Sequence, residues 1–318
     1  MSIADVEHSC SHTAGYRHEA LFYDGTDDLL AGLVPFVRDA VAADEPTLVV
    51  LGAAKLDALR AALNGEAEQV HFADMAEVGA NPARIIPAWQ RFLDDHAGAA
   101  PAVRGIGEPI WAGRSPAELA ECERHEALLN VAFADPRFWL LCPYDTGTLP
   151  SAVLDEARRN HPFVSDGATA ARSDRFPGGE ALAVPFAVAL PDPPPEALST
   201  AITRGTLREI RQLVGHFTAA ARMDDGPAAD LVLTVHELAT NSVLHGGGEG
   251  SLLLWREPGA VVCEIRDRGR IVEPLAGRVE PAGILEGGRG LWMANQLCDL
   301  VQIRSFADGG AVRVHQRL

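Results

Sequence analysis

The C-terminal part of the chain carries polar residues whose spacing suits a metal–nucleotide complex. In the segment 236–248, H-E-L-A-T-N-S-V-L-H-G-G-G, Glu237 and Asn241 are four residues apart and therefore share one face of a helix. An amide oxygen can ligate Mg²⁺, which keeps waters and phosphate oxygens as its other ligands. A carboxylate on the same face can orient or deprotonate a hydroxyl nucleophile. Taken alone, a Glu and an Asn at this spacing are more often an ordinary surface pair.

Two further segments can supply groups for a base and for phosphates. Asp267 ends an apolar run, and its carboxylate can accept a hydrogen bond from an adenine amino group, while Gly269 lets the backbone pass close to the base. An aspartate at such a place usually just begins a turn. The segment G-G-R-G at 287–290 precedes a helical pattern, so backbone N–H groups and the positive helix end can face an anion. Arg289 can add a charge-assisted contact to phosphate.

The elements that must position these residues alternate in a recognisable order. We expect helices at 196–221, 227–245 and 291–297, a hairpin of strands at 251–255 and 260–266, and two last strands at 300–306 and 311–316. Helices combined with antiparallel strands favour an α+β two-layer sandwich.

Taken together, the three segments resemble the conserved boxes of the GHKL ATP-binding superfamily, which includes histidine kinases, DNA gyrase and the anti-sigma factor serine kinases. The stretches E-L-A-T-N-S-V-L-H-G, D-R-G and G-R-G-L-W-M-A-N-Q-L-C-D most resemble the anti-sigma branch. The resemblance implies a Bergerat-type ATP-binding fold over residues 196–318, with ATP and Mg²⁺ as cofactors.

The resemblance also assigns roles to individual residues. It makes Glu237 the catalytic base, Asn241 the Mg²⁺ ligand and Asp267 the group that reads adenine, while Gly269 shapes the base pocket. The other residues that the resemblance places against the nucleotide, several of them in the phosphate lid, are His245, Gly288, Arg289, Gly290 and Leu291. One departure concerns Ile271, which stands where the family often has a second glycine after the aspartate. This substitution puts lid mobility and turnover in question more than nucleotide binding.

The first half of the chain alternates between short apolar runs and amphipathic helical patterns, which predicts a mainly parallel sheet flanked by helices. Ligands of such sheets bind beyond the carboxyl ends of the strands. This part resembles, more loosely, the MEDS-type sensory domains, through H-E-A-L-F-Y at 18–23 and F-W-L-L-C-P-Y-D at 138–145. His18, Tyr23 and Asp145 are candidate pocket residues, although a structural role fits each of them equally well.

The expected organisation is therefore a flexible N-terminus at 1–15, a sensory α/β domain at 16–165, a linker at 166–195 and the ATP-binding domain at 196–318. The linker assignment rests on the sequence P-D-P-P-P at 191–195, which neither a helix interior nor a central strand tolerates.

Composition narrows the function classes further. The formal net charge of −17 argues against direct nucleic-acid binding and against an anionic membrane surface. No apolar run is long enough to span a bilayer, and the N-terminus lacks the pattern of a signal peptide, so we expect a cytoplasmic protein. The five cysteines are dispersed without a C-x-x-C pair, which is typical of reduced thiols in core packing. No histidine pair has a zinc-like spacing.

The most probable function on these grounds is that of an anti-sigma factor with serine-protein kinase activity, controlled by the sensory domain. Its partners would be a STAS-type anti-anti-sigma protein, a sigma factor and an unidentified small ligand, and homodimerisation is common in the branch that it resembles.

Three alternatives remain open. A non-catalytic ATP-binding interaction module is compatible with Ile271. A sensor histidine kinase would need a phosphoacceptor, for which His125 and His236 are the candidates. A two-domain metabolic enzyme lacks any nucleophile–base signature.

Overall fold

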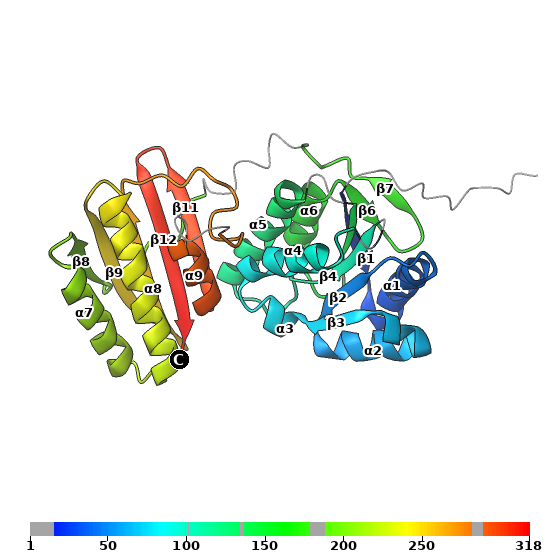
Figure 1. Cartoon of the computed structure of the whole chain (residues 1–318), viewed down its shortest axis with the longest axis horizontal. Helices are drawn as coiled ribbons and strands as arrows, with labels where there is room; N and C mark the ends of the chain where they lie inside the picture. Colours follow the sequence, from blue (N-terminus) through cyan, green and yellow to red (C-terminus); the bar gives the residue numbers. More distant parts are fainter. Residues whose placement is uncertain (1–15, 99, 101, 134–136, 179–187, 282–288) are drawn as a thin grey trace, which may run out of the picture.

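The computed structural model describes residues 16–98, 100, 102–133, 137–178, 188–281 and 289–318. The N-terminus expected at 1–15 lies outside the described residues. Two lobes lie side by side, one built on each of two β-sheets (Figure 1).

The N-terminal lobe is built on a seven-stranded sheet in the order β3-β2-β4-β5-β1-β6-β7. All neighbouring strands run parallel except β6 and β7, which run antiparallel. Its strands are β1 (Arg17–Tyr23), β2 (Thr47–Leu51), β3 (His71–Asp74), β4 (Val103–Gly107), β5 (Phe138–Asp145), β6 (Phe163–Ser165) and β7 (Ala170–Arg172). The predicted parallel sheet is confirmed. Its last two strands were not anticipated, because they are short, and β7 lies within the segment expected to be linker.

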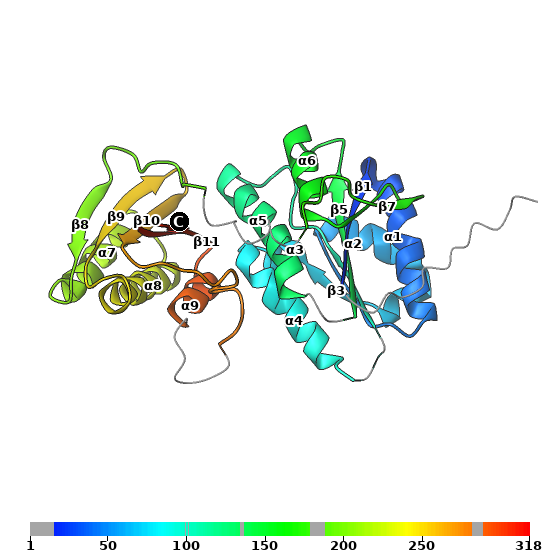
Figure 2. The same ribbon diagram turned by 90° about the horizontal axis from the view of Figure 1, so that it is seen from above.

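Helices cover both faces of this sheet (Figures 1 and 2). They are α1 (Gly25–Ala42), α2 (Ala53–Leu63), α3 (Met75–Val78), α4 (Ile85–Asp95), α5 (Pro116–Ala132) and α6 (Ser151–Asn160), with short 3₁₀ turns at Asn64–Gln69 and Pro82–Arg84. Strand β1 shows why the lobe has two cores. Leu21 and Tyr23 pack with α1 and α2, whereas Ala20 and Phe22 point to the core under α4, α5 and α6.

The C-terminal lobe is a five-stranded antiparallel sheet in the order β11-β12-β10-β9-β8, with three helices packed on one face (Figure 2). Its elements are β8 (Leu198–Ile202), α7 (Leu207–Ala220), α8 (Asp225–Leu244), β9 (Gly250–Glu257), β10 (Ala260–Asp267), α9 (Arg289–Leu297), β11 (Leu300–Phe306) and β12 (Gly309–Arg317). The two-layer α+β sandwich expected from the sequence is confirmed.

One predicted element of this lobe is wrong. The helix expected from residue 196 begins only at Leu207, and Leu198–Ile202 forms the edge strand β8 instead. This segment pairs with β9 and buries Ile202 in the core, and such tertiary pairing overrides a helical pattern read from sequence.

Buried polar contacts join the two lobes. The carboxylate of Glu121 on α5 accepts hydrogen bonds from Arg304 of β11 at 2.8 Å and from Arg278 of the β10–α9 loop at 3.1 Å. The side chain of Arg84 donates to the backbone oxygens of Asn295 and Cys298. Both the β10–α9 loop and α9 therefore contact the N-terminal lobe directly.

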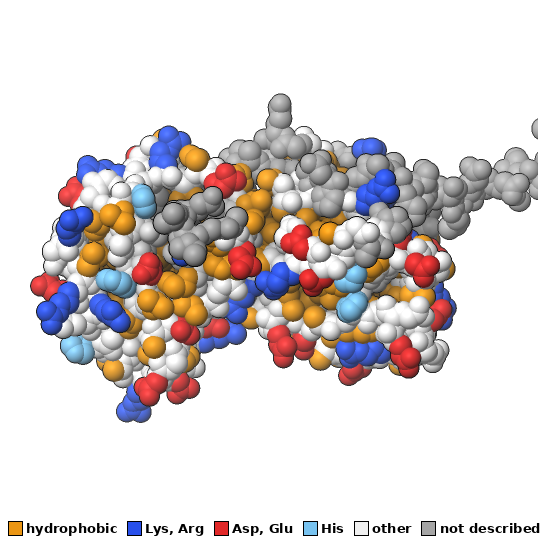
Figure 3. Space-filling view, in the orientation of Figure 1, with side chains coloured by type: hydrophobic (Ala, Val, Ile, Leu, Met, Phe, Trp, Pro, Cys, Tyr) orange, Lys and Arg blue, Asp and Glu red, His pale blue; other side chains and the backbone are white. Residues whose placement is uncertain are grey.

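None of the helices in the described part of the chain has the length and apolar character needed to cross a bilayer. On the face shown in Figure 3, acidic and basic side chains are interspersed over both lobes.

Candidate functional site

Helix α8 carries the two residues with which the sequence argument began. Glu237 and Asn241 are both partly buried and lie one helical turn apart. Among the described residues, neither the Glu237 carboxylate nor the Asn241 carboxamide hydrogen-bonds a protein group. Both side chains are therefore available to a ligand.

The Asp267 carboxylate is held in one orientation at the end of β10. One of its oxygens accepts a hydrogen bond from the Ser242 hydroxyl on α8. The other accepts from the backbone N–H of Gly269, at 2.7 Å. Because strand, helix and loop all contribute, the carboxylate is pre-organised, with lone pairs left over for a donor on a ligand.

Glycines allow this close approach of α8, β10 and α9. A Cβ atom on Gly246 would lie 2.4 Å from the Asp267 carboxyl carbon, and one on Gly290 would lie 2.6 Å from the Asn241 amide nitrogen. At Gly246 the added Cβ would also lie 2.7 Å from the backbone oxygen of Ser242, so only glycine fits there, whereas at Gly290 it would displace the Asn241 carboxamide.

A cavity of about 330 Å³ opens beside Asp267. Its walls are mainly apolar, and the residues that form them come from α8, β10, the following loop, α9 and β12: Leu238, Asn241, Ser242, His245, Gly246, Ile265, Asp267, Gly269, Arg270, Ile271, Leu291, Gly310, Ala311 and Val312. An apolar slot with one fixed carboxylate suits a flat heterocycle with an exocyclic amino group.

A second cavity of about 470 Å³ lies at the N-terminus of α9 and is lined by Glu237, Glu280, Pro281, Arg289, Gly290, Trp292 and Met293. Its walls include the first turn of α9, whose backbone N–H groups have no partner within the helix. Gly290 lines this cavity and its neighbour Leu291 lines the first, so the two cavities lie beside each other where α9 faces Asn241. This geometry suits a nucleotide whose base lies in the first cavity and whose phosphates reach the second.

Comparison with known proteins agrees with this geometry. Residues 200–315 match the histidine kinase-like ATPase domain, and residues 17–162 match MEDS, the methanogen/methylotroph, DcmR sensory domain. The chain joins a MEDS domain to a histidine kinase-like ATPase domain. No curated protein matches the chain.

Among solved structures, the chain is similar to a crystal structure of the RsbU and RsbW domains of a Mycobacterium tuberculosis protein. The identity is 22%, the TM-score is 0.30, and the match covers 39% of this chain and 33% of that one. The chain thus spans about a third of the length of that structure.

The structure brings together nearly all residues expected at the nucleotide site of the ATPase domain. Asn241, His245, Asp267, Gly269 and Leu291 line the first cavity, and Glu237, Arg289 and Gly290 line the second. Gly288 lies outside the described residues. Asn241 lines the first cavity next to Gly290 of the second, and it has no hydrogen-bonded protein partner among the described residues. It therefore fits a Mg²⁺ ligand, because an amide oxygen is a hard donor.

The sequence argument missed Ser242 and Gly246, which fix and accommodate Asp267. Both stand inside the segment that was singled out, but only the fold shows that α8 ends against β10. Ile271 proves to be a wall of the base cavity. Its N–H donates to the Ser305 hydroxyl at 3.0 Å, and its side chain packs against the core of the ATPase domain.

The three pocket candidates of the MEDS domain do not share one pocket. The Tyr23 hydroxyl donates to Glu108 at 2.6 Å, and Lys55 donates to the same carboxylate at 2.6 and 2.7 Å. Burial, followed by the Glu108 carboxylate, raises the pKa of the Tyr23 phenol well above its usual value. Asp145 is the register partner of Tyr23, whereas His18 lies towards the other end of β1, beside Glu126.

The fold also bears on the histidine-kinase alternative. His125 is 1% exposed and lies in α5, inside the MEDS domain. Burial lowers the pKa of its imidazole to about 3. A phosphoacceptor must reach a γ-phosphate, so this histidine does not suit the role.

Proposed function

We propose that the C-terminal domain binds Mg-ATP and passes the γ-phosphate to a serine of a STAS-type antagonist protein, while the same domain in its other state holds a sigma factor. The observation that carries the proposal is the fixed Asp267 carboxylate in an apolar cavity that also contains Asn241 and lies beside a second cavity at the start of α9. The motifs around Glu237, Asp267 and Arg289 resemble the anti-sigma branch, which supports the choice of partner class.

Each side chain would have a separate task in this reaction. Asp267 would accept a hydrogen bond from the adenine amino group, and the apolar walls would exclude water from the base. Asn241 would hold Mg²⁺, which supplies charge neutralisation at the phosphates.

Glu237, one turn earlier on the same helix, would take the proton of the serine hydroxyl as its oxygen bonds the γ-phosphorus and ADP departs. The phosphate on the antagonist would then add negative charge to its binding surface and release it.

Calorimetric titration with ATP, with and without Mg²⁺, tests the binding step. We expect binding that depends on Mg²⁺ in the wild type, loss of the Mg²⁺ dependence in Asn241→Ala, and at least about tenfold weaker binding in Asp267→Asn. The variant Asp225→Asn is the matched control, because Asp225 is an exposed carboxylate at the opposite end of α8. Folded wild-type protein that binds no ATP would overturn the proposal.

The transfer step needs a separate test with a STAS-type protein and ATP labelled at the γ-phosphate. Glu237→Gln should keep ATP affinity and lose transfer by about 10²–10⁴-fold, the usual contribution of a general base. A non-catalytic interaction module is the second candidate, favoured by Ile271 in the wall of the cavity. It predicts Mg-ATP binding together with antagonist or sigma-factor binding, but no transfer from the wild type.

A further inference from the structure

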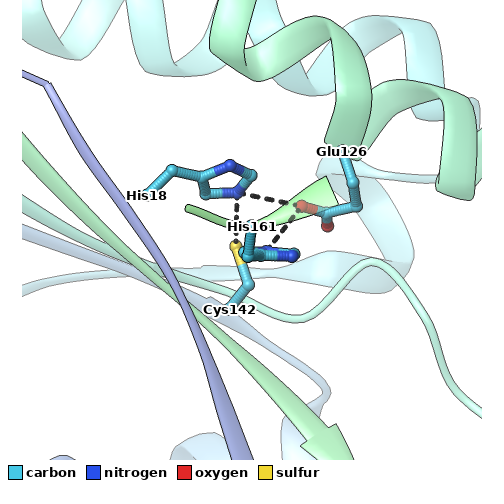
Figure 4. A group of neighbouring side chains, drawn as sticks. All are labelled: His18, Glu126, Cys142 and His161. Atoms are coloured by element: carbon cyan, nitrogen blue, oxygen red, sulfur yellow. Dashed lines mark hydrogen bonds and ion pairs between the residues drawn. The ribbon is translucent and has the colours of Figure 1, made fainter. Parts of the chain in front are cut away.

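Four side chains from distant parts of the sequence converge inside the MEDS domain (Figure 4). His18 comes from β1, Glu126 from α5 and Cys142 from β5, while His161 follows α6 directly. All four are buried, and their nitrogen, oxygen and sulfur donor atoms lie within 4.8 Å of one another. None of them takes part in the chemistry proposed for the ATPase domain.

The spacing of the donor atoms is that of a coordination shell. Glu126 Oε2 lies 3.1 Å from His18 Nε2 and 3.3 Å from His161 Nε2, and Cys142 Sγ lies 3.4 Å from His18 Nε2. A tetrahedral ion with bonds of roughly 2.0–2.3 Å holds neighbouring donors about 3.3–3.6 Å apart. The three separations given fall in or near this range, and the remaining donor pairs lie within 4.8 Å, so a modest inward movement of the side chains would complete the shell.

The histidines are oriented in the way that metal ligands usually are. His18 Nδ1 lies 3.2 Å from the Asn130 side-chain oxygen, and His161 Nδ1 lies 2.8 Å from the backbone oxygen of Ala157. Because these oxygens are acceptors, each ring carries its hydrogen on Nδ1 and presents the Nε2 lone pair to the cluster.

In this arrangement, hydrogen-bond acceptors face one another with no hydrogen atom between them. Two Nε2 lone pairs point towards a carboxylate, and both His161 Nε2 and Glu126 Oε1 are buried without a hydrogen-bond partner among the described residues. Unpaired buried polar atoms are costly and call for an explanation. A cation at the centre would give both histidine Nε2 atoms and Glu126 Oε2 a partner.

We propose that His18, Glu126, Cys142 and His161 bind one tetrahedral divalent transition-metal ion, with Zn²⁺ as the best match. Two imidazoles, one thiolate and one carboxylate form a mixed donor set of the kind that zinc prefers, whereas Mg²⁺ and Ca²⁺ prefer oxygen alone. On binding, the Cys142 thiol gives up its proton to solvent and the sulfur–metal bond forms. The four protein ligands leave no open position, so this site is structural or regulatory rather than catalytic.

The position of the site gives it a path to the ATPase domain. Helix α5 carries Glu126, and on another face it carries Glu121, which pairs with Arg278 and Arg304 of the ATPase domain. A change in the placement of α5 when Glu126 binds a metal would therefore reach the β10–α9 loop beside the nucleotide site.

Metal analysis and cobalt substitution of the full chain test the proposal. Wild-type protein, stripped with a chelator and refilled with Zn²⁺ or Co²⁺, should hold one equivalent, and the cobalt form should show sulfur-to-cobalt charge-transfer absorption. Cys142→Ser should lose that absorption, and His161→Gln should lower the metal affinity by at least about tenfold.

Cys122→Ser is the matched control, because Cys122 is also fully buried and lies on α5, but its thiol hydrogen-bonds Pro109 outside the cluster. This variant should keep both the bound metal and the cobalt spectrum. The proposal is overturned if wild-type protein with native circular dichroism takes up no metal, or if Cys142→Ser keeps the charge-transfer band. Neither result depends on ATP, so failure here leaves the proposed kinase function standing.

Discussion

At the scale of single residues, the proposed nucleotide site depends on how little space surrounds the Asp267 carboxylate. Its carboxylate is confined between Ser242 of α8, the backbone of Gly269 and the bare Cα of Gly246. An aspartate held in this way loses little conformational entropy when it accepts a hydrogen bond from a ligand, because its orientation is already fixed. The absence of a side chain at Gly246 is therefore as important for the proposed binding of ATP as the Asp267 carboxylate itself.

Gly246→Ala tests this point. The new methyl would lie 2.4 Å from the Asp267 carboxyl carbon, so the carboxylate must move. We expect ATP affinity to fall at least about tenfold, and the free energy of unfolding to fall by about 1–3 kcal/mol from overpacking. Gly226→Ala in the first turn of α8 is the control, since no atom lies within 4 Å of its added Cβ, and calorimetry should show unchanged affinity. Equal affinities for both variants would contradict the argument.

Glu123 on α5 offers a test of pH dependence at the same scale. Burial, and then the nearby Glu156 carboxylate, raise the pKa of the Glu123 carboxyl from 4.5 to about 7, against the opposing effect of Arg159. The folded state therefore holds this proton more tightly than the unfolded state does, and that stabilisation disappears as pH rises through about 7. Glu123→Gln removes the penalty.

Urea unfolding of Glu123→Gln and wild type should therefore give similar stabilities below pH 4.5, with the variant gaining relative to the wild type as pH rises towards 7. A difference that does not vary with pH would show that the carboxyl titrates normally in the folded chain.

At the scale of elements, helix α5 packs within the MEDS domain and also contacts the ATPase domain. A capping box fixes its start, with the Ser115 hydroxyl accepting from the Glu118 N–H and the Glu118 carboxylate accepting from the Ser115 N–H. Its Glu121 is 1% exposed and lies among Arg124, Arg278 and Arg304. Burial lowers the pKa of Arg124 to about 9 and the Glu121 carboxylate opposes this shift, so Glu121 supplies the counter-charge of these buried guanidinium groups.

Glu121→Gln should therefore destabilise the chain by about 3–5 kcal/mol, because it leaves buried guanidinium groups without their counter-charge. Arg317→Gln is the control, since its ion pair with Glu118 also joins the two lobes but is exposed at the Arg317 end. It should change the unfolding free energy by less than about 1 kcal/mol. Denaturant unfolding of both variants measures the difference, and a small effect of Glu121→Gln would mean that water enters this interface.

The sequence predicted helices and strands correctly where a long periodic pattern of apolar residues marks them. It failed where pairing with a distant strand determines the structure. Helices α8 and α9 and strands β9, β10, β11 and β12 lie within two residues of their predicted bounds, since each has a strong apolar pattern. The edge strand β8 and the short strands β6 and β7 depend on neighbours far away in the chain.

The same division holds for the two sites. The expected nucleotide residues follow from local motifs, and the fold gathers them around the cavities. The cluster of His18, Glu126, Cys142 and His161 has no ligand spacing in the sequence, because four separate elements contribute one donor each. Only the arrangement of β1, β5, α5 and α6 reveals it.

At the scale of the whole molecule, side chains of the MEDS domain hydrogen-bond the β10–α9 loop and α9 of the ATPase domain. Arg278 belongs to the loop between β10 and α9, and Asn295 of α9 donates to the backbone oxygen of Gly277 in the same loop. Arg84 holds α9 from the other lobe. A metal that repositions α5 would therefore act on the loop and the helix that lead to Arg289 and Gly290, beside the proposed nucleotide site.

The last prediction follows from this coupling and rests on both proposals. Filling the cluster with Zn²⁺ should change the ATP dissociation constant by about 5–150-fold, and ATP should change the metal dissociation constant by the same factor, since coupling is reciprocal. Arg278→Met should abolish the change while both ligands still bind, because Glu121 keeps Arg304 and Arg124 as partners. Arg317→Gln should leave the coupling intact. Titrations with ATP in the presence and absence of Zn²⁺, and with Zn²⁺ in the presence and absence of ATP, measure the coupling. Independent binding of the two ligands in the wild type would show that the interface joins the lobes without transmitting a signal.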